Sequence, residues 1–201
     1  MTNKLNWAIV SEKLQNKKMS LFTPSGFFSL LGVSENTGKN LLSAYTRKGF
    51  FIKIKNSFYI TKASKPNDFE IANKIYRPSY ISFETALSYH NVLPEIVYSI
   101  TSATSKASRE YVILDKSFIY HRIKEELFFG YNAIKINGQT ILMADKEKAL
   151  LDYIYFVALK KKPDNDRLNI KDISVPKIKK YLKKYSNSLL EEKIKKLLTI
   201  K

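Results

Sequence analysis

Residues 23–49, TPSGFFSLLGVSENTGKNLLSAYTRKG, decide the fold of the N-terminal part of the chain. Thr23 is a good helix N-cap, and Pro24 suits the first helical position, where its missing N–H costs nothing. Gly32 fits the left-handed position that ends a helix, and Ser34 can cap the helix that follows. The stretch therefore predicts two short helices joined by a tight turn.

The residues on either side of this stretch complete a small domain. A rough apolar stripe within residues 5–18 predicts a preceding helix. Residues 50–55 and 58–60 favour two strands joined at Asn56-Ser57. Helix, helix, turn, helix and hairpin is the element order of a winged helix, which we predict for residues 1–63.

A second domain is predicted at residues 68–201, after a short polar linker. Its expected elements are a helical region at 69–92 interrupted at Pro78, strands between about 97 and 142, and helices at about 145–160, 175–185 and 188–200. The helix at 145–160 should be apolar on one face. Ser82 and Ser188 are expected N-caps. Asn137-Gly138 is a strong hairpin dipeptide, so we expect an antiparallel sheet and an α+β fold.

Positive charge is concentrated at the two ends of the chain. The 35 Lys and Arg residues exceed the 18 Asp and Glu residues, which gives a net charge of +17. Residues 1–65 and 160–201 each carry +9, whereas residues 66–159 carry −1. Such basic regions usually bind a polyanion or an acidic surface. For the C-terminal region, exposed faces of amphipathic helices, with lysine stems covering apolar surface, are an equally good interpretation.

The helix that begins after Ser34 has one polar face. Asn, Ser and Lys side chains near the N-terminal half of a helix can match base edges in the major groove, and basic residues farther along or on the hairpin can contact phosphates. The predicted DNA-binding residues are Ser34, Asn36, Thr37, Lys39, Asn40, Ser43, Arg47, Lys48, Lys53, Lys55 and Asn56. The alternative is a solvated face on a domain that docks protein, but the charge favours DNA.

The sequence contains no motif typical of a catalytic or metal site. It has no cysteine, and His90 and His121 lie too far apart for a short zinc motif. A serine-nucleophile elbow and a glycine-rich phosphate loop are also absent. The run DKEK at residues 145–148 could suggest a metal-dependent nuclease, but acids in a first helical turn are ordinary partners of the helix dipole. We expect no enzyme activity, metal or cofactor, and we interpret both histidines as structural.

The sequence also shows no membrane segment. No run approaches the roughly 18 to 20 apolar residues that span a bilayer, and residues 1–21 mix charged and apolar side chains. We expect a soluble, cytoplasmic protein with no membrane partner.

Three parts of the predicted second domain resemble the AbiEi family of type IV toxin–antitoxin antitoxins. They are PSYISFETALSYH at residues 78–90 followed by VYSIT at 97–101, ELFFGY at 126–131, and ADKEKALLD at 144–152. With the predicted winged helix, the resemblance covers about residues 20–160. Its specificity comes from the joint order of the runs, because none of them is a catalytic motif.

The resemblance implies an abortive-infection (phage-defence) regulator that represses its own operon by binding promoter repeats through the winged helix. The second domain would counter a nucleotidyltransferase-like toxin, and whether it binds that toxin directly stays open. Two or more copies, for example a homodimer, would engage the repeats, because one winged helix contacts only a short half-site. Two alternatives remain: a transcription factor that senses a small ligand through a tyrosine-lined pocket, and the metal-dependent nuclease.

Overall fold

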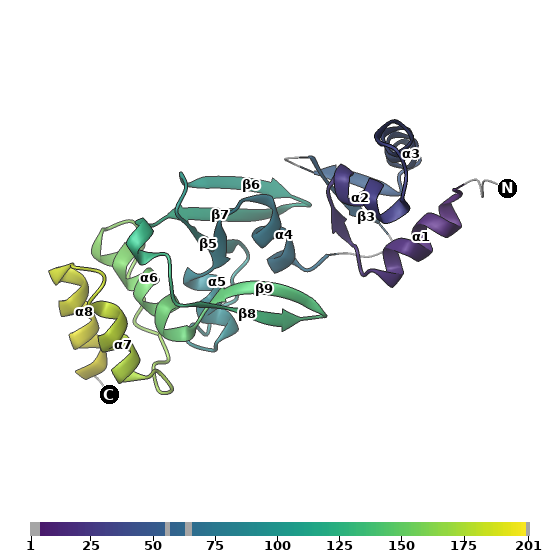
Figure 1. The fold of residues 1–201 in the computed structure, drawn as a ribbon. Coiled ribbons are helices and arrows are strands. Elements are labelled where there is room, and N and C mark those ends of the chain that lie inside the picture. Colours follow the sequence, from purple (N-terminus) through teal and green to yellow (C-terminus); the bar gives the residue numbers. More distant parts are fainter. Residues whose placement is uncertain (1–4, 55–56, 63–65, 200–201) are drawn as a thin grey trace. The chain divides into compact units, whose positions relative to one another are not determined.

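The computed structural model describes residues 5–54, 57–62 and 66–199, which form an α+β fold (Figure 1). The chain divides into two compact units, Met1–Ile71 and Ala72–Lys201. Helix α4 (Asp68–Ile75) runs through the division between them.

The first unit combines three helices with a small sheet. Its elements are α1 (Trp7–Asn16), β1 (Leu21–Phe22), α2 (Pro24–Leu31), α3 (Glu35–Arg47), β2 (Phe51–Ile54) and β3 (Phe58–Thr61). The strands pair in the order β1-β3-β2, and both pairings are antiparallel. The helices and the hairpin agree with the sequence prediction, whereas β1 was not predicted, because two residues are too few for a periodic pattern. The predicted hairpin positions Lys55 and Asn56 lie outside the described residues.

Local capping explains where α2 and α3 begin and end. The Thr23 hydroxyl oxygen accepts a hydrogen bond from the Gly26 amide at 3.2 Å. The Ser34 hydroxyl oxygen accepts one from the Thr37 amide at 3.4 Å. Gly32 lies between the two helices at φ 68°, in the left-handed region that favours glycine. The predicted caps are therefore confirmed.

Aromatic side chains form the core of the first unit. Phe51 lies edge-on to Phe22 and to Phe27, with ring centroids 5.0 and 5.5 Å apart. Buried Gly38 of α3 packs directly against the Phe28 ring of α2, where a Cβ atom would lie 2.2 Å from Cδ1. The absence of a side chain at Gly38 thus lets α2 and α3 approach closely.

The second unit is built on a six-stranded sheet. Its remaining elements are β4 (Ser79–Ile81), α5 (Phe83–Tyr89), β5 (Ile100–Thr104), β6 (Arg109–Ile113), β7 (Lys116–Arg122), a 3-10 turn (Glu125–Leu127), β8 (Tyr131–Ile136), β9 (Gln139–Ala144), α6 (Lys146–Ala158), α7 (Val175–Leu182) and α8 (Ser188–Thr199). The strand order is β6-β7-β5-β4-β9-β8.

This sheet is mixed, so the prediction of an antiparallel sheet is wrong. Two inner pairings, β5 with β7 and β4 with β9, are parallel. The hairpin at Asn137-Gly138 is confirmed, with both residues at positive φ between β8 and β9. A turn dipeptide predicts only the pairing of two strands that are consecutive in the chain. The parallel pairs join strands that are not consecutive, so no turn dipeptide could predict them.

The region predicted to be helical at residues 69–92 contains a strand. Its two helices, α4 and α5, are separated by β4, which pairs with β5 and β9. The predicted cap Ser82 precedes α5 but makes no side-chain capping bond there. The predicted cap Ser188 is wrong, because Ser188 is already the first residue of α8 and the Asn187 side chain accepts from the Leu190 amide at 2.8 Å.

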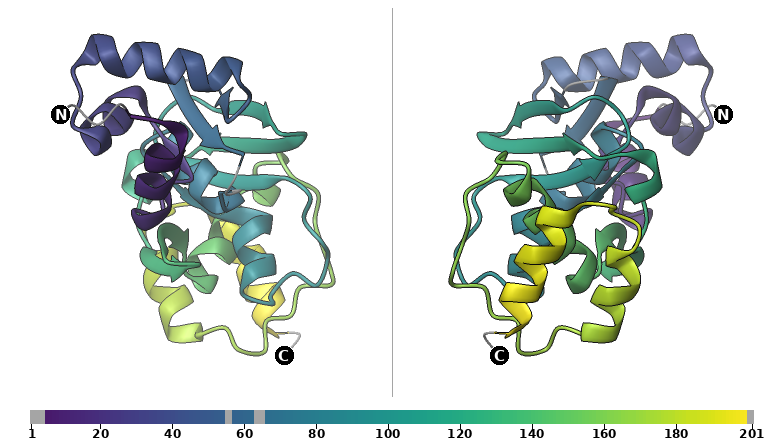
Figure 2. Two further views of the ribbon diagram at one scale, coloured as in Figure 1. Left: turned by 90° about the vertical axis from the view of Figure 1, so that its right-hand side faces the viewer. Right: turned by 90° about the vertical axis from the view of Figure 1, so that its left-hand side faces the viewer.

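Helix α6 is the central helix of the second unit, and α5, α7 and α8 pack against it (Figure 2). All of its residues except Lys146 are buried. The prediction of one apolar face was therefore too narrow. Periodicity counts lysine and aspartate as outward-facing, whereas Lys148 and Asp152 of α6 are buried and paired with each other.

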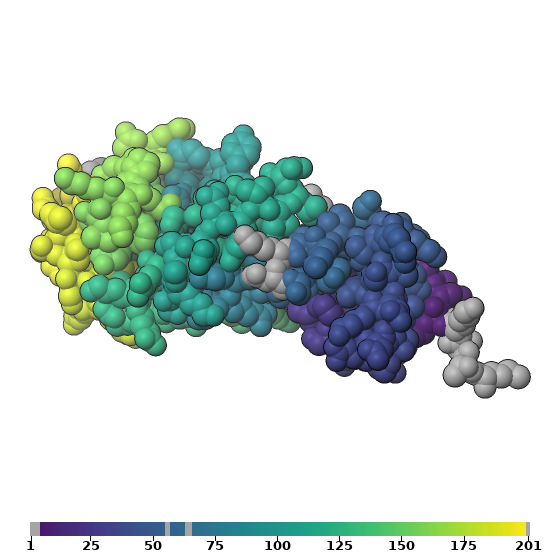
Figure 3. Space-filling model, turned by 90° about the horizontal axis from the view of Figure 1, so that it is seen from above, coloured from purple at the N-terminus to yellow at the C-terminus, as the bar shows by residue number. Residues whose placement is uncertain are grey.

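Helices α7 and α8 lie at the surface of the second unit, coloured yellow-green and yellow in Figure 3. They bury Ile178, Leu190 and Ile194. Exposed lysines include Lys179 and Lys180 of α7, Lys183 and Lys184 in the turn that follows it, and Lys195 and Lys196 of α8. Within the basic C-terminal region, α7 and α8 are thus amphipathic helices with exposed lysines, whereas residues 159–174 form no helix.

Candidate nucleic-acid interface

The polar face of α3 is exposed along the whole helix. Gly38, Leu42 and Tyr45 are buried and fix the orientation of α3 in the first unit. Eight of the predicted DNA-binding residues are exposed on α3, its N-cap and its C-cap: Ser34, Asn36, Thr37, Lys39, Asn40, Ser43, Arg47 and Lys48. The helix thus brings these residues to one surface.

Two of these residues already have a structural task. Ser34 caps α3, and its hydroxyl lies 3.0 Å from the hydroxyl of Thr37. Asn36, Asn40 and Ser43 have no such side-chain bond among the described residues. Their polar groups are therefore available to a ligand, whereas Ser34 and Thr37 also maintain the helix start.

Basic side chains surround the polar face. Lys39 forms a surface ion pair with Glu35 one turn earlier, with 2.6 Å between Nζ and Oε1. The hydrogen bond from Lys39 lowers the pKa of the Glu35 carboxyl. Exposed pairs of this kind contribute little stability, so DNA can replace Glu35 as the partner of Lys39 at small cost. Arg47 has no ion-pair partner within the described part of the chain.

In the small sheet, three residues lie side by side on neighbouring strands, one on each of β1, β3 and β2. Tyr59 of β3 lies opposite Phe22 of β1 and opposite Lys53 of β2. Residues directly opposite each other in antiparallel strands point to the same face of a sheet. Phe22 is buried, Tyr59 is half-buried and Lys53 is exposed, so this predicted residue lies next to Tyr59 at the surface.

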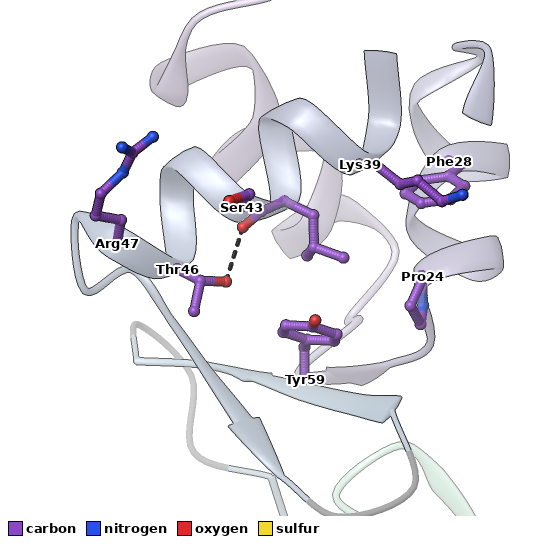
Figure 4. Close-up of a pocket in the computed structure, with 8 residues that line it drawn as sticks. Pro24, Phe28, Lys39, Ser43, Thr46, Arg47 and Tyr59 are labelled. Atoms are coloured by element: carbon purple, nitrogen blue, oxygen red, sulfur yellow. Dashed lines mark hydrogen bonds between the residues drawn. The ribbon is translucent and has the colours of Figure 1, made fainter. Parts of the chain in front are cut away.

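A groove of about 510 Å³ lies between α2, α3 and β3 (Figure 4). Its lining residues are Pro24, Phe28, Lys39, Leu42, Ser43, Thr46, Arg47 and Tyr59. Tyr59 faces α3 across the groove, while Lys39 and Arg47 lie toward opposite ends of the helix. The sequence prediction missed the contributions of Pro24, Phe28 and Tyr59, because the groove depends on the packing of α2 and the sheet around α3.

A second polar cluster lies inside the second unit, and we call it the buried network. Lys148 and Asp152 of α6 form an ion pair, and neither side chain is exposed to solvent. The Asp152 carboxylate also accepts hydrogen bonds from Tyr80, Ser82 and Tyr185, at 3.1, 2.8 and 2.8 Å. The Lys148 ammonium donates to the Tyr185 hydroxyl oxygen at 2.7 Å.

Burial sets the protonation properties of this network. It lowers the pKa of Lys148, although the charge of Asp152 favours the ammonium form. Burial and the nearby Asp152 charge raise the pKa of Tyr80 and Tyr185 well above the ordinary value. Both phenols therefore keep their protons at neutral pH and donate to the carboxylate. Because Lys148 and Asp152 have no exposed surface, the network holds elements together and offers no access to a substrate.

The buried network is also where the three sequence runs of the resemblance meet. Tyr80 and Ser82 come from the first run, and Lys148 and Asp152 come from the third. Gly130 of the second run packs on the Lys148 side chain, where a Cβ atom would lie 2.9 Å from Cγ. Segments far apart in the sequence thus share one structural centre.

The carboxylates of the DKEK run are paired with α7. Lys177 lies 3.1 Å from both the Asp145 and the Glu147 carboxylates. Asp145 also accepts from the Tyr181 hydroxyl at 2.9 Å, and Glu147 from the Ser174 amide at 3.0 Å. These contacts give the run a structural role in joining α7 to α6. The described residues include no group of three or more His, Cys, Asp and Glu side chains that could hold a metal ion.

The two histidines lie in different surroundings. The His90 Nε2 atom is 2.8 Å from the Ala144 carbonyl oxygen. The His121 ring contacts Phe83 and Phe156, and its Nε2 atom has no hydrogen-bond partner among the described residues. Burial, followed by the positive charge of Lys162, lowers the pKa of His121 to about 4.

No protein-family model matches the chain, and no curated protein matches it. The resemblance to the AbiEi family therefore rests on the residue runs alone. Among the described residues, no helix is long and apolar enough to cross a membrane.

Proposed function

We propose that the first unit is a winged helix that binds double-stranded DNA, with α3 as its recognition helix. The element order α1-β1-α2-α3-β2-β3 and the three-stranded sheet support this proposal. The single observation that carries it is the exposed face of α3, which combines amide, hydroxyl and cationic side chains in a region with a net charge of +9.

The residues of this face would divide two tasks. Asn36, Lys39 and Asn40 lie in the N-terminal half of α3, where side chains of a recognition helix contact base edges. Arg47 near the helix end and Lys53 on β2 would contact phosphates, which adds affinity without sequence information.

For the whole chain, we propose an antitoxin that represses its own operon in the cytoplasm by binding promoter repeats, as the resemblance to the AbiEi family implies. The second unit would counter a nucleotidyltransferase-like toxin. The three sequence runs that resemble the family contact one another at the buried network. The resemblance therefore concerns residues that lie close together in the folded unit. Two copies on neighbouring repeats would increase affinity through effective concentration.

The test measures promoter binding and growth rescue in parallel with full-length variants. Lys39→Ala/Arg47→Ala removes two charges from α3, and Lys17→Ala/Lys106→Ala removes two exposed charges elsewhere as a control. We expect the α3 variant alone to lose promoter binding and to keep the rescue of cells that express the neighbouring toxin. Equal effects of the two variants would contradict DNA binding through α3.

The same cells distinguish the antitoxin from the alternatives. If the unaltered chain binds its promoter but rescues no toxin-expressing cells, the antitoxin proposal fails and a ligand-responsive transcription factor remains. A change in promoter affinity on adding a small ligand would then support that alternative. Magnesium-dependent cleavage of the promoter duplex would instead reveal a nuclease.

A further inference from the structure

The groove beside α3 has an apolar floor whose aromatic rings are held in place by the core. Phe28 packs under Gly38, and Tyr59 stacks on buried Phe22 with ring centroids 6.0 Å apart and planes inclined by 14°. One side of the Tyr59 ring therefore packs on Phe22 in the core, and the ring also lines the groove between α2 and α3 (Figure 4).

The hydroxyl groups at the groove differ in their availability. The Thr46 hydroxyl donates to the Leu42 carbonyl oxygen at 2.7 Å, so it is already used within α3. The hydroxyls of Ser43 and Tyr59 have no hydrogen-bond partner in the part of the chain that the structure describes. A phenol with a packed ring and a free hydroxyl is typical of sites where one end of the side chain meets a polar ligand.

Cations border the groove on several sides. Lys39 and Arg47 are eight positions apart on α3, or about 12 Å along the helix axis. Lys53 lies directly opposite Tyr59 on the same sheet face. The lining residues include no carboxylate among the described residues. The groove therefore offers apolar surface, hydroxyl donors and positive charge together.

We propose that this groove binds the sugar–phosphate backbone of one DNA strand, with the Tyr59 hydroxyl donating a hydrogen bond to a phosphate oxygen. The inference rests on the proposed DNA binding and adds Tyr59 to the interface as a residue that the sequence did not indicate. Deoxyribose packs on the rings of Phe28 and Tyr59, and Ser43 and Arg47 supply further donors to the phosphates. Such contacts fix the register of α3 on the duplex and carry no sequence information.

The experiment uses the full-length chain, its own promoter duplex and a scrambled duplex of equal length. Tyr59→Phe removes only the hydroxyl and keeps the ring. We expect its Kd to rise about 10-fold or more for both duplexes, as loss of one hydrogen bond to a charged group predicts. Because the phenol is neutral, the slope of log Kd against log salt should not change, whereas Arg47→Gln should lower it by about 0.9. Tyr98→Phe, at a tyrosine that is 83% exposed in the second unit, is the matched control.

Each outcome decides a different question. If the unaltered chain binds neither duplex, the proposed DNA binding itself fails. If Tyr59→Phe binds both duplexes as the unaltered chain does, only the groove inference is overturned. A loss confined to the promoter duplex also overturns it, because the hydroxyl would then contact a base.

Two further measurements complete the test. If Tyr59→Phe does not fold, Ser43→Ala is used instead, because alanine favours the helix. We again expect an equal loss of affinity for the promoter duplex and the scrambled duplex. Inorganic phosphate, compared with chloride at equal ionic strength, separates a site for a free anion from one for DNA. Competition by phosphate without any effect of Tyr59→Phe on DNA affinity would overturn the backbone contact.

Discussion

Lys148 and Asp152 lie one turn apart on α6, and their paired side chains are completely buried at the centre of the second unit. A buried ion pair contributes stability only when further hydrogen bonds compensate for the lost hydration. Tyr80, Ser82 and Tyr185 provide these bonds from β4, from the start of α5 and from the segment after α7. The pair therefore acts as a fixed point to which separate elements attach.

Asp152→Ala should strongly destabilise the second unit, because it leaves the Lys148 charge buried without a partner. We expect its free energy of unfolding in urea to fall by about 3–5 kcal/mol. Lys148→Met/Asp152→Leu should lose less, since it leaves no unpaired charge. Lys193→Ala breaks a surface pair with Asp164 and should cost less than about 1 kcal/mol. Similar losses for Asp152→Ala and Lys193→Ala would refute this account.

Gly38→Ala should destabilise the first unit and weaken promoter binding, because its Cβ atom would lie 2.2 Å from the Phe28 ring and force α2 and α3 apart. Overpacking should cost about 1–3 kcal/mol, more than the roughly 1 kcal/mol that alanine contributes to a helix. At Gly26 the nearest atom is 3.4 Å away, so Gly26→Ala should be neutral or stabilising. Thermal unfolding and promoter affinity check both variants, and Phe28→Leu/Gly38→Ala should recover part of the loss. Equal stability of the two single variants would contradict close packing at Gly38.

The second unit should lose stability as the pH falls from about 6.5 toward 4. Burial lowers the pKa of His121 from 6.5 to about 4, so in this range the unfolded chain binds a proton that the folded chain does not. Lys162 and Lys161 also lower this pKa, and Glu84 raises it. The stabilising contribution is therefore present above pH 6.5 and is lost as the pH falls through the folded pKa.

His121→Phe provides the comparison, because it keeps an aromatic ring beside Phe83 and Phe156 and removes the titrating group. The midpoint of thermal unfolding, measured at several pH values, should fall less steeply below pH 6.5 in this variant. Parallel curves for the two proteins would show that His121 is not the responsible group.

The sequence predicts those parts of the fold that neighbouring residues determine. The hydrogen bonds of Thr23 and Ser34 reach residues only three positions away, and the backbone angle of Gly32 is a property of that residue. These features therefore follow from the local sequence. The turn at Asn137-Gly138 is local in the same sense. For this reason the helices of the first unit and the hairpin of the second were predicted correctly.

Features that depend on distant partners could not be predicted in this way. Ser82 has the side chain of a helix cap, yet its hydroxyl donates to Asp152, which lies 70 residues later in the chain. Lys148 and Asp152 have a spacing that suits a surface ion pair, and only the packing of other elements around α6 makes them buried. Tyr59 belongs to the groove because β3 lies beside α2 and α3, which precede it in the chain and give no local signal of this packing.

Asn40 should determine which DNA sequence the chain prefers. Its exposed amide lies in the N-terminal half of α3, and an Asn side chain can pair with adenine in the major groove. Asn40→Ala should reduce the ratio of promoter affinity to scrambled-duplex affinity by about 10-fold, as the loss of one base contact predicts. Because asparagine is uncharged, affinity for the scrambled duplex should stay unchanged. Arg47→Gln should weaken binding to both duplexes equally and preserve the ratio. If both variants lower the two affinities in parallel, α3 contacts only the backbone, and the proposed specificity for promoter repeats must come from another part of the chain.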